Sequence, residues 1–234
     1  MIAREGLHII VIGLVITAGL VVVATRYDSR SALVLSLVFG LLTVFSIFFF
    51  RDPVRKITAS DGCLVAPADG RVIAVESIPD HPYIGGPAVK VSIFLSIFDV
   101  HVNRVPASGR IDYVSYNPGK FFAAFKDKAS HLNEQTEIGM TASRGHKIIF
   151  KQIAGLIARR IVCRLEAGDE VSAGDRFGII RFGSRAELIF PAESDVRVKL
   201  GQHVAGGKSQ IGYLPPENDN PIEESNARGK NIQI

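Results

Sequence analysis

A mainly β body (α+β) behind an N-terminal transmembrane helical hairpin is the fold that this sequence of 234 residues predicts. Two observations carry the prediction. Residues 1–56 contain two long apolar stretches almost free of ionisable side chains, and from Ile57 onward the chain consists of short apolar runs separated by glycine, proline and aspartate. Such runs with turn residues between them are typical of β-barrels and β-sandwiches. We therefore expect a hairpin anchor over residues 1–56, a β-rich domain over residues 57–215 and a flexible tail over residues 216–234.

The bulk composition points to a membrane protein rather than a nucleic-acid-binding one. Hydrophobic residues make up 47% of the chain, which is high for a wholly soluble protein. The formal net charge of +4 is a mild basic excess that anionic lipid headgroups would suit as well as nucleic acid, so we expect no nucleic-acid partner. The two cysteines, Cys63 and Cys163, lie in apolar runs without a CxxC spacing, which favours two buried reduced thiols and no metal.

Residues 7–25 and 32–50 are the two candidate membrane helices, and His8 is the only ionisable residue in either. At a rise of about 1.5 Å per residue, a stretch of about 19 residues spans roughly 28 Å, close to the thickness of a bilayer core. A cleaved signal peptide fits poorly, because a second equal stretch follows after RYDSRS and no small-residue cleavage site stands out between them. A helical hairpin in the core of a globular domain is the remaining alternative.

Basic residues around the hairpin predict its orientation. They are more numerous at the two ends of the hairpin than in the loop between its helices. Basic flanks stay on the cytoplasmic side, so the β-rich domain should lie on the cytoplasmic face of the inner cell membrane. The basic residues at the ends are Arg4, Arg51, Arg55 and Lys56, and those in the loop are Arg26 and Arg30.

A series of apolar runs makes up the predicted β-rich domain. Turn residues bound each run, as expected for strands at short spacing. The segment EAGDEVSAGDRFGII, with its two Gly-Asp turns, is also similar to the hairpins of biotinyl and lipoyl carrier domains. The runs are residues 63–78, 88–105, 109–116, 146–165, 176–182, 186–190 and 196–200.

Residues 117–139 break the strand-like pattern. Phenylalanines and lysines recur there at a spacing that suits a short amphipathic helix or lid. Its phenylalanines would either face the core of the domain or contact membrane lipid. The residues concerned are Lys120, Phe121, Phe122, Phe125, Lys126 and Lys128.

The run RFGSRAELIFP, residues 181–191, is interrupted by Gly183 and Ser184. Both flanks are rich in β-formers, so a Gly-Ser step weakens strand packing and pairing there. A turn or bulge is the simplest interpretation. Hydrolase templates do not fit, because the sequence has no GxSxG around Ser184 and no SxxK or HExxH. A carrier domain does not fit either, because FGSR lacks the lysine that would be modified.

A further option is that Ser184 cuts the peptide bond that precedes it. A hydroxyl can attack the preceding carbonyl and form an ester when the peptide is strained, a base removes the hydroxyl proton and donors hold the oxyanion. Glycine at position 183 removes the Cβ that would crowd this attack. Elimination from the ester leaves dehydroalanine at position 184, which hydrolyses to an N-terminal pyruvoyl group. Such a ketone can form an imine with a substrate amine and act as an electron sink.

Five motifs, in order from about Arg51 to Pro215, bear on this option. They are APADGRV (66–72), FLSIFDVHVNRVP (94–106), NPGKFFAAF (117–125) with LNEQ (132–135), QIAGLIARRIV (152–162) and RFGSRAELIFP (181–191). With them the chain resembles phosphatidylserine decarboxylase proenzymes of the short bacterial type, which carry an N-terminal membrane hairpin. The FGSR motif joined to the DVHxNR-type motif is the most specific part of the resemblance.

The resemblance implies roles for individual residues. Ser184 would be the cleavage nucleophile that attacks the Gly183 carbonyl and becomes the pyruvoyl group, the cofactor of the enzyme. The products would be a heterodimer of chains 1–183 and 184–234. Asp69, in the PxDG-type segment, would assist self-cleavage, although ADG also suits an ordinary solvated turn. His101 would polarise the substrate carboxylate or protonate the carbanion, although a histidine beside a strand is often only structural.

One position departs from the family pattern. Longer relatives carry a second histidine three residues further on, a candidate base for self-cleavage, and this chain has Arg104 there. Arginine cannot act as a base at neutral pH, although its planar fork can hold a carboxylate or phosphate. The base is then either Asp69 acting directly or His101 acting twice, with His131 and His146 as weaker candidates.

The implied reaction is removal of CO2 from phosphatidylserine to give phosphatidylethanolamine, without metal or nucleotide. Its partners would be the phospholipid bilayer and phosphatidylserine, and a homo-oligomer stays open. Arg104, Lys120 and Phe121 are the candidate lipid contacts, because a basic and partly apolar mouth suits a phospholipid substrate. Two alternatives are a decarboxylase of a related serine lipid on an archaeal-type ether backbone, and a membrane-anchored adaptor whose lipoyl-like hairpins only scaffold partners.

Overall fold

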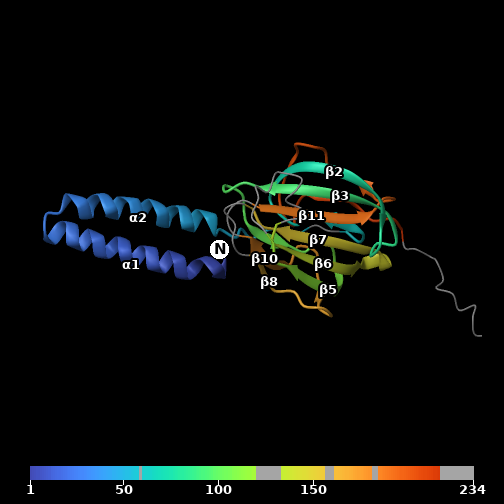
Figure 1. Ribbon diagram of the computed structural model, residues 1–234, viewed down its shortest axis with the longest axis horizontal. Coiled ribbons are helices and arrows are strands. Elements are labelled where there is room, and N and C mark those ends of the chain that lie inside the picture. Colours follow the sequence, from blue (N-terminus) through green and yellow to red (C-terminus); the bar gives the residue numbers. More distant parts are fainter. Residues whose placement is uncertain (58–59, 120–132, 156–160, 181–183, 217–234) are drawn as a thin grey trace, which may run out of the picture.

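The computed structural model describes residues 1–57, 60–119, 133–155, 161–180 and 184–216. The described residues form two helices and a β body. In Figure 1 the helices extend side by side from one end of the body. The mainly β prediction and the N-terminal hairpin are thereby confirmed.

The hairpin consists of α1 (Arg4–Arg26) and α2 (Arg30–Phe49), which begin slightly before the ranges expected from the sequence. Ser29 caps the second helix, since its hydroxyl accepts a hydrogen bond from the Ala32 amide at 3.3 Å. The helices approach closely where Gly13 faces Thr43, because a Cβ on that glycine would collide with the threonine side chain. Small residues at such a contact let two apolar helices pack without bulky side chains between them.

Most of the hairpin surface is exposed. The most apolar windows of α1 and α2 have mean hydropathies of 2.7 and 2.6, and only 6% and 22% of these windows are buried. Helices of this length and composition can cross a membrane. Their exposed apolar surface does not fit the alternative of a hairpin inside a globular core.

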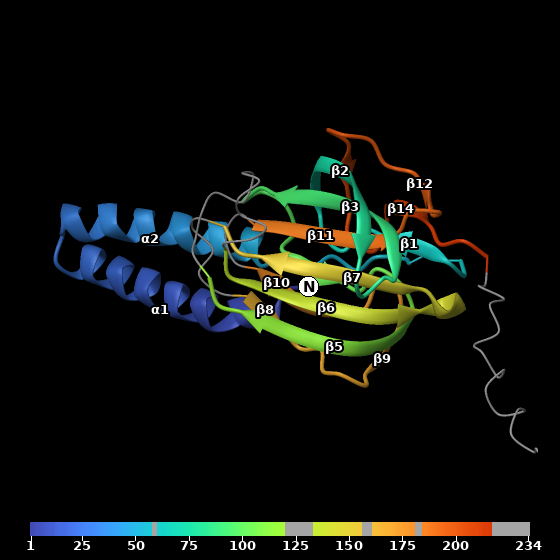
Figure 2. The same cartoon turned by 45° about the vertical axis from the view of Figure 1, so that its right-hand side comes forward.

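The body is built on a curled sheet of eight strands, in which every neighbouring pair is antiparallel (Figure 2). The order across the sheet is β13 (His203–Val204), β2 (Gly70–His81), β3 (Gly86–Leu95), β11 (Ser184–Pro191), β7 (Lys147–Ile153), β6 (Gln135–Ala142), β5 (Gly109–Asn117) and β9 (Glu170–Val171). β6 and β7 are joined through a 3-10 turn, η1 (Ser143–Gly145).

Two smaller antiparallel sheets complete the body. One has the order β1 (Cys63–Val65), β14 (Gln210–Tyr213) and β12 (Asp195–Val196). The other has the order β4 (Val102–Arg104), β10 (Arg176–Ile180) and β8 (Ile161–Cys163).

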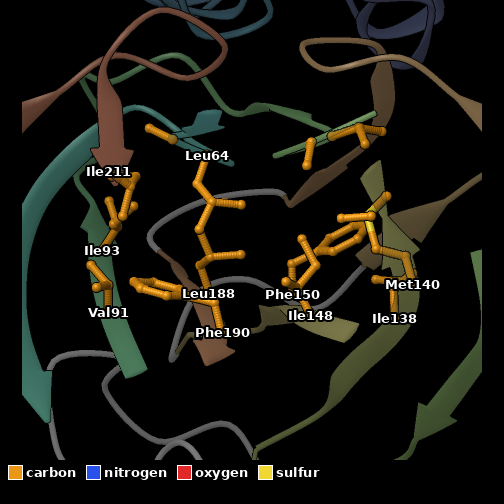
Figure 3. Packing of buried hydrophobic residues seen from close by; sticks show 14 of the residues in the cluster. Leu64, Val91, Ile93, Ile138, Met140, Ile148, Phe150, Leu188, Phe190 and Ile211 are labelled. Carbon is orange, nitrogen blue, oxygen red and sulfur yellow. The ribbon is translucent and has the colours of Figure 1, made fainter. Parts of the chain in front are cut away.

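The main hydrophobic core joins the eight-stranded sheet to the smaller sheets (Figure 3). Alternate residues of a strand point to the same face, and the core takes such pairs from four neighbouring strands of the large sheet. Leu64 of β1 and Ile211 of β14 close the cluster from the other side. The pairs are Val91 and Ile93 from β3, Leu188 and Phe190 from β11, Ile148 and Phe150 from β7, and Ile138 and Met140 from β6.

A second apolar cluster joins the hairpin to the body. Phe49 and Phe50, at the end of α2, pack with Val100, Val102 and Ile179 of the β4–β10 region and with Ala3 before α1. The main chain adds to this contact, since the Ala3 amide donates to the Phe50 carbonyl at 2.8 Å. The hairpin therefore meets the body through buried side chains as well as through the covalent chain.

Several expected strand boundaries needed correction. The runs 63–78, 88–105 and 146–165 each contain two strands, namely β1 and β2, β3 and β4, and β7 and β8. Of the run 196–200 only Val196 belongs to a strand, β12, and the strands β9, β13 and β14 lie outside the expected runs. β6 begins at Gln135, inside the range 117–139 that was expected to lie outside the sheet, because its main chain pairs with both β5 and β7. The Phe- and Lys-containing segment of that range and most of the expected tail lie outside the described residues.

Candidate active site

Ser184 is the first residue of β11, a strand that is buried along its whole length. Ser184 lies opposite Leu95, the last residue of β3, and from Arg185 onward β11 also pairs with β7. The Ser184 side chain is 0% exposed, and its hydroxyl has no hydrogen-bond partner among the described residues. Leaving such a group unpaired costs about 1–3 kcal/mol, so a buried free hydroxyl calls for an explanation, and a catalytic role is one of them.

His101 ends the loop between β3 and β4, and Asp99 shapes this loop. The Asp99 carboxylate accepts hydrogen bonds from the Ser96 amide and hydroxyl, both at 2.8 Å. The Asp99 carbonyl lies 2.9 Å from Nδ1 of His101. A carbonyl can only accept, so Nδ1 carries the proton and Nε2 of the neutral ring presents a lone pair. Nε2 is buried and has no partner among the described residues.

Burial lowers the pKa of His101 from 6.5 to about 4. The hydrogen bond to the Asp99 carbonyl and the charges of Asp99 and Asp69 oppose this shift, while Arg51 adds to it. Desolvation has the largest effect on this pKa, because the ring is 0% exposed and lies against Phe49, with 4.1 Å between the ring centroids. The imidazole is therefore neutral at pH 7, with a lone pair on Nε2.

Asp69 lies in the loop before β2 and is 8% exposed, so it is not a solvated turn residue. Arg55 donates to both carboxylate oxygens, at 2.6 Å and 2.7 Å. The Gly206 amide donates to Oδ1 at 2.8 Å, and Arg55 also donates to the Gly206 carbonyl. A bidentate arginine and a main-chain amide thus fix the position of the Asp69 side chain.

Strand pairing brings these segments to one end of the body. Arg71 of β2 and Arg185 of β11 both lie opposite Phe94 of β3. A small buried cluster contains Ala68, Leu95 and Ala186, so the neighbour of Asp69 packs against β3 and against β11, the strand that carries Ser184. The charge of Asp69 also acts on His101. Figure 1 shows that β3 ends and β11 begins at the end of the body that faces the hairpin.

Comparison with known proteins identifies the family of the chain. A family model described as phosphatidylserine decarboxylase matches residues 42–212. The chain belongs to the phosphatidylserine decarboxylase family. Three relatives are named phosphatidylserine decarboxylase proenzyme. They are a protein of Symbiobacterium thermophilum (47% identity, 74% of this chain and 81% of the relative), one of Desulfotalea psychrophila (41%, 91% and 96%) and one of Magnetococcus marinus (45%, 77% and 83%).

Arg104, the departure from the pattern of longer phosphatidylserine decarboxylases, is 4% exposed. Its guanidinium lies 3.2 Å from an Asp52 carboxylate oxygen and donates to the carbonyls of Gly174 and Pro53, at 3.0 Å and 3.1 Å. Burial lowers the pKa of Arg104. These protein contacts favour a structural part for the side chain, and its contact with lipid phosphate stays a prediction.

Of the remaining predicted site residues of this phosphatidylserine decarboxylase family member, the structure describes His146 but not the other four. Gly183, Lys120, Phe121 and His131 lie outside the described residues. His146 begins the approach to β7, and its Nε2 lies 3.3 Å from the Pro216 carbonyl. β7 runs from there toward the hairpin, so His146 sits at the opposite end from Ser184 (Figure 2).

Three contacts of the site were missed from the sequence. Phe49 contacts His101, Arg51 donates to the Phe98 carbonyl at 2.5 Å, and Arg55 pairs with Asp69. In the sequence, Phe49 is the end of an apolar stretch and the two arginines are basic flanks of a hairpin. No spacing rule links them to residues in later loops. Among the described residues, no group of three His, Cys, Asp or Glu side chains could hold a metal ion.

Proposed function

We propose that this chain is a membrane-anchored carboxy-lyase that converts phosphatidylserine to phosphatidylethanolamine with a pyruvoyl group made from Ser184. The observation that carries the proposal is the buried, unpaired Ser184 hydroxyl at the start of a central strand. The relatives named as phosphatidylserine decarboxylase proenzymes support the substrate, the reaction and a precursor that is processed. A lipid substrate agrees with two exposed apolar helices next to the site.

The residues around Ser184 suit a pyruvoyl group. The group is small and uncharged, so it can occupy a fully buried strand end without the desolvation cost of a charge. When present, it supplies a ketone that condenses with the substrate amine and draws electrons from the bond between Cα and the carboxylate. β3 and β7 flank β11 and would hold the group at a fixed place in the sheet.

In the proposed self-cleavage, Oγ of Ser184 attacks the Gly183 carbonyl carbon. The C–O bond forms as the C–N bond breaks, so the amide becomes an ester and the Ser184 nitrogen becomes an amine. Removal of the Ser184 Cα proton then expels the Gly183 carboxylate and leaves dehydroalanine. Addition of water and loss of ammonia give the ketone. The products are chains 1–183 and 184–234.

His101 is the better supported base for the attack. Its neutral ring has a lone pair on Nε2, whereas Nδ1 is occupied by the Asp99 carbonyl. Both oxygens of Asp69 already accept charge-assisted hydrogen bonds from Arg55. Moving a proton to Asp69 would weaken that ion pair, so we assign Asp69 to charge stabilisation near His101 rather than to proton abstraction.

His101 also serves the decarboxylation. Loss of CO2 leaves electron density on the substrate Cα, and each turnover takes up one proton from solvent. The His101 ring is neutral at pH 7, so Nε2 first takes up that proton from solvent, and an imidazolium whose pKa is lowered to about 4 then gives the proton up readily. We therefore assign delivery of this proton to Nε2 of His101.

The same fold supports two further parts of the proposal, the anchoring of the body to the membrane and the association of the two cleaved chains. The hairpin would cross the inner membrane with the body on the cytoplasmic face, as its basic flanks predict. After cleavage the smaller chain would stay bound, because β11 pairs along one edge with β3 and along the other with β7. A serine lipid on an archaeal-type ether backbone would present the same headgroup and is the alternative substrate.

Denaturing mass spectrometry of the full chain tests the proposal. We expect two chains that break between residues 183 and 184, with a blocked N-terminus on the smaller one, and CO2 release from phosphatidylserine vesicles. Ser184→Ala should stay intact and inactive. Ser194→Ala is the matched control, since Ser194 is another buried serine whose hydroxyl is unpaired among the described residues. An intact single chain in active membranes would refute the proposal, and parallel vesicles of ether-linked serine lipid decide the substrate.

A further inference from the structure

After α2, the chain runs along the end of the body where Ser184, His101 and Asp69 lie. We name residues 49–55 the hairpin joint. Its first two residues, Phe49 and Phe50, are each 1% exposed, and their rings meet edge to face at 5.0 Å. The joint is also tied to the start of the chain, since the Asp52 amide donates to the Met1 carbonyl at 2.8 Å. A segment packed in this way is too well fixed to act as a loose tether.

The joint covers one face of the His101 ring. The centroids of Phe49 and His101 are 4.1 Å apart and their planes are inclined by 35°. The ring is thus held at its edge by the Asp99 carbonyl on Nδ1 and on its face by Phe49. Two contacts of different direction fix the orientation of an imidazole, and with it the direction of the lone pair on Nε2.

The joint also holds the loop on which His101 lies. The Arg51 guanidinium donates to the Phe98 carbonyl at 2.5 Å and to the Phe48 carbonyl at 3.0 Å. It lies 4.0 Å from the centroid of the Phe48 ring, which fixes the guanidinium through a cation–π contact. Arg51 therefore links the end of α2 to the loop between β3 and β4.

The far end of the joint holds Asp69 and Arg104. Arg55 forms the bidentate ion pair with Asp69, and the two side chains are 10% and 12% exposed. Asp52 accepts a hydrogen bond from Arg104 at 3.2 Å and forms an ion pair with Arg176 at 2.5 Å. Asp69 and His101, the two side chains assigned to proton and charge control, thus each contact one residue of the joint.

We propose that the hairpin joint is an integral part of the active site, in which Phe49 positions His101 and Arg55 positions Asp69. This inference rests on the proposed function for what those two residues do. The hairpin would accordingly be more than a membrane tether, because the two helices end in the residues that orient the catalytic groups. The same chemistry could not be kept by exchanging the hairpin and joint for an unrelated anchor.

A titration of His101 tests the role of Phe49 without catalysis. The full chain with Ser184→Ala is held in detergent micelles, and the His101 ring is followed by NMR and assigned with a His101→Asn variant. Phe49→Ala admits water to the ring face, so the pKa of His101 should rise by about one unit or more. The charged groups that act on the ring, Asp99, Asp69 and Arg51, are unchanged by this variant.

Leu42→Ala is the matched control, since Leu42 is an apolar residue of the same helix that is 55% exposed. It should leave the titration unchanged. Should Phe49→Ala fail to fold, Phe49→Leu keeps most of the apolar volume and should shift the titration in the same direction by a smaller amount. A folded Phe49 variant whose His101 titrates as before overturns the inference. The proposed function does not enter this readout, so the two ideas can fail separately.

Two substitutions of Arg55 test its role, one that removes the charge and one that keeps the charge but changes the shape of the side chain. Arg55→Gln should slow self-cleavage about tenfold or more, and Arg55→Lys, which keeps the charge but loses the planar fork, should recover part of the rate. Arg197→Gln is the control, because Arg197 pairs with Asp195 on the surface. Unchanged cleavage in both Arg55 variants overturns this half of the inference. Absence of cleavage in the unmodified chain would instead reject the proposed function.

Discussion

Arg55 and Asp69 form a bidentate ion pair at 2.6 Å and 2.7 Å, with both side chains about nine-tenths buried. The pair joins the segment after the hairpin to the loop before β2. Breaking one side of such a pair leaves an uncompensated charge away from water. This relationship makes the consequences of changing Asp69 predictable.

Asp69→Asn should destabilise the chain by about 3 kcal/mol, because Arg55 keeps its charge and loses its partner. We expect a lower thermal midpoint of the uncleaved Ser184→Ala chain in detergent. The double variant Asp69→Asn with Arg55→Gln should recover part of the loss, since it removes the stranded charge. Equal destabilisation in the single and double variants would show that the ion pair is not the cause.

His101→Gln should slow self-cleavage by about a hundredfold or more, because the glutamine side chain cannot take the Ser184 proton. The rate is measured by following conversion of the full chain into chains 1–183 and 184–234. His146→Gln is the control, since His146 lies at the other end of the body. Cleavage of His101→Gln at the normal rate would return Asp69 to the role of base.

Stability should fall on acidification between about pH 6.5 and pH 4 because of His101. Its pKa is lowered from 6.5 to about 4 in the folded chain, so the unfolded chain binds the extra proton in this window. The stability contributed by the neutral ring is present above the unfolded pKa and is lost as the pH falls toward the folded pKa, by up to about 3 kcal/mol. Thermal midpoints of Ser184→Ala across this range check the slope, and adding His101→Asn should flatten it.

Leu188→Ala should destabilise the uncleaved chain by about 2–5 kcal/mol. Leu188 is fully buried in β11, the strand that would hold the smaller chain in the sheet. In the cleaved enzyme the same change should lower the denaturant concentration at which the two chains separate. Leu200→Ala is the control, because Leu200 is 71% exposed. Identical separation in both variants would contradict this role of β11.

The sequence was sufficient for the hairpin, the β body and the family. Long apolar stretches and a specific motif are local signals, and local signals can be recognised without coordinates. The loop at 96–101 could not be predicted, because the run 88–105 has no glycine or proline to mark a turn and gives no sign that Asp99 turns the chain. The pairing of Arg55 with Asp69 and the contact of Phe49 with His101 were hidden, since each depends on tertiary packing between segments that no periodicity connects.

Arg104 is another residue whose contacts could not be predicted from the sequence. Its residue type excluded a base, but nothing in the sequence indicates that Asp52 and two main-chain carbonyls contact the guanidinium. A buried arginine and a lipid-binding arginine look alike in one sequence. The difference lies in which acidic residue the fold brings beside it.

The place of β11 between β3 and β7 sets an order of events during biosynthesis. β11 leaves the ribosome after both neighbouring strands have been made. The sheet is completed when β11 enters the gap between them, and Ser184 then reaches the strand end where His101 and Asp69 are gathered. In the proposed mechanism, self-cleavage therefore waits until β11 has paired with two strands that are made before it.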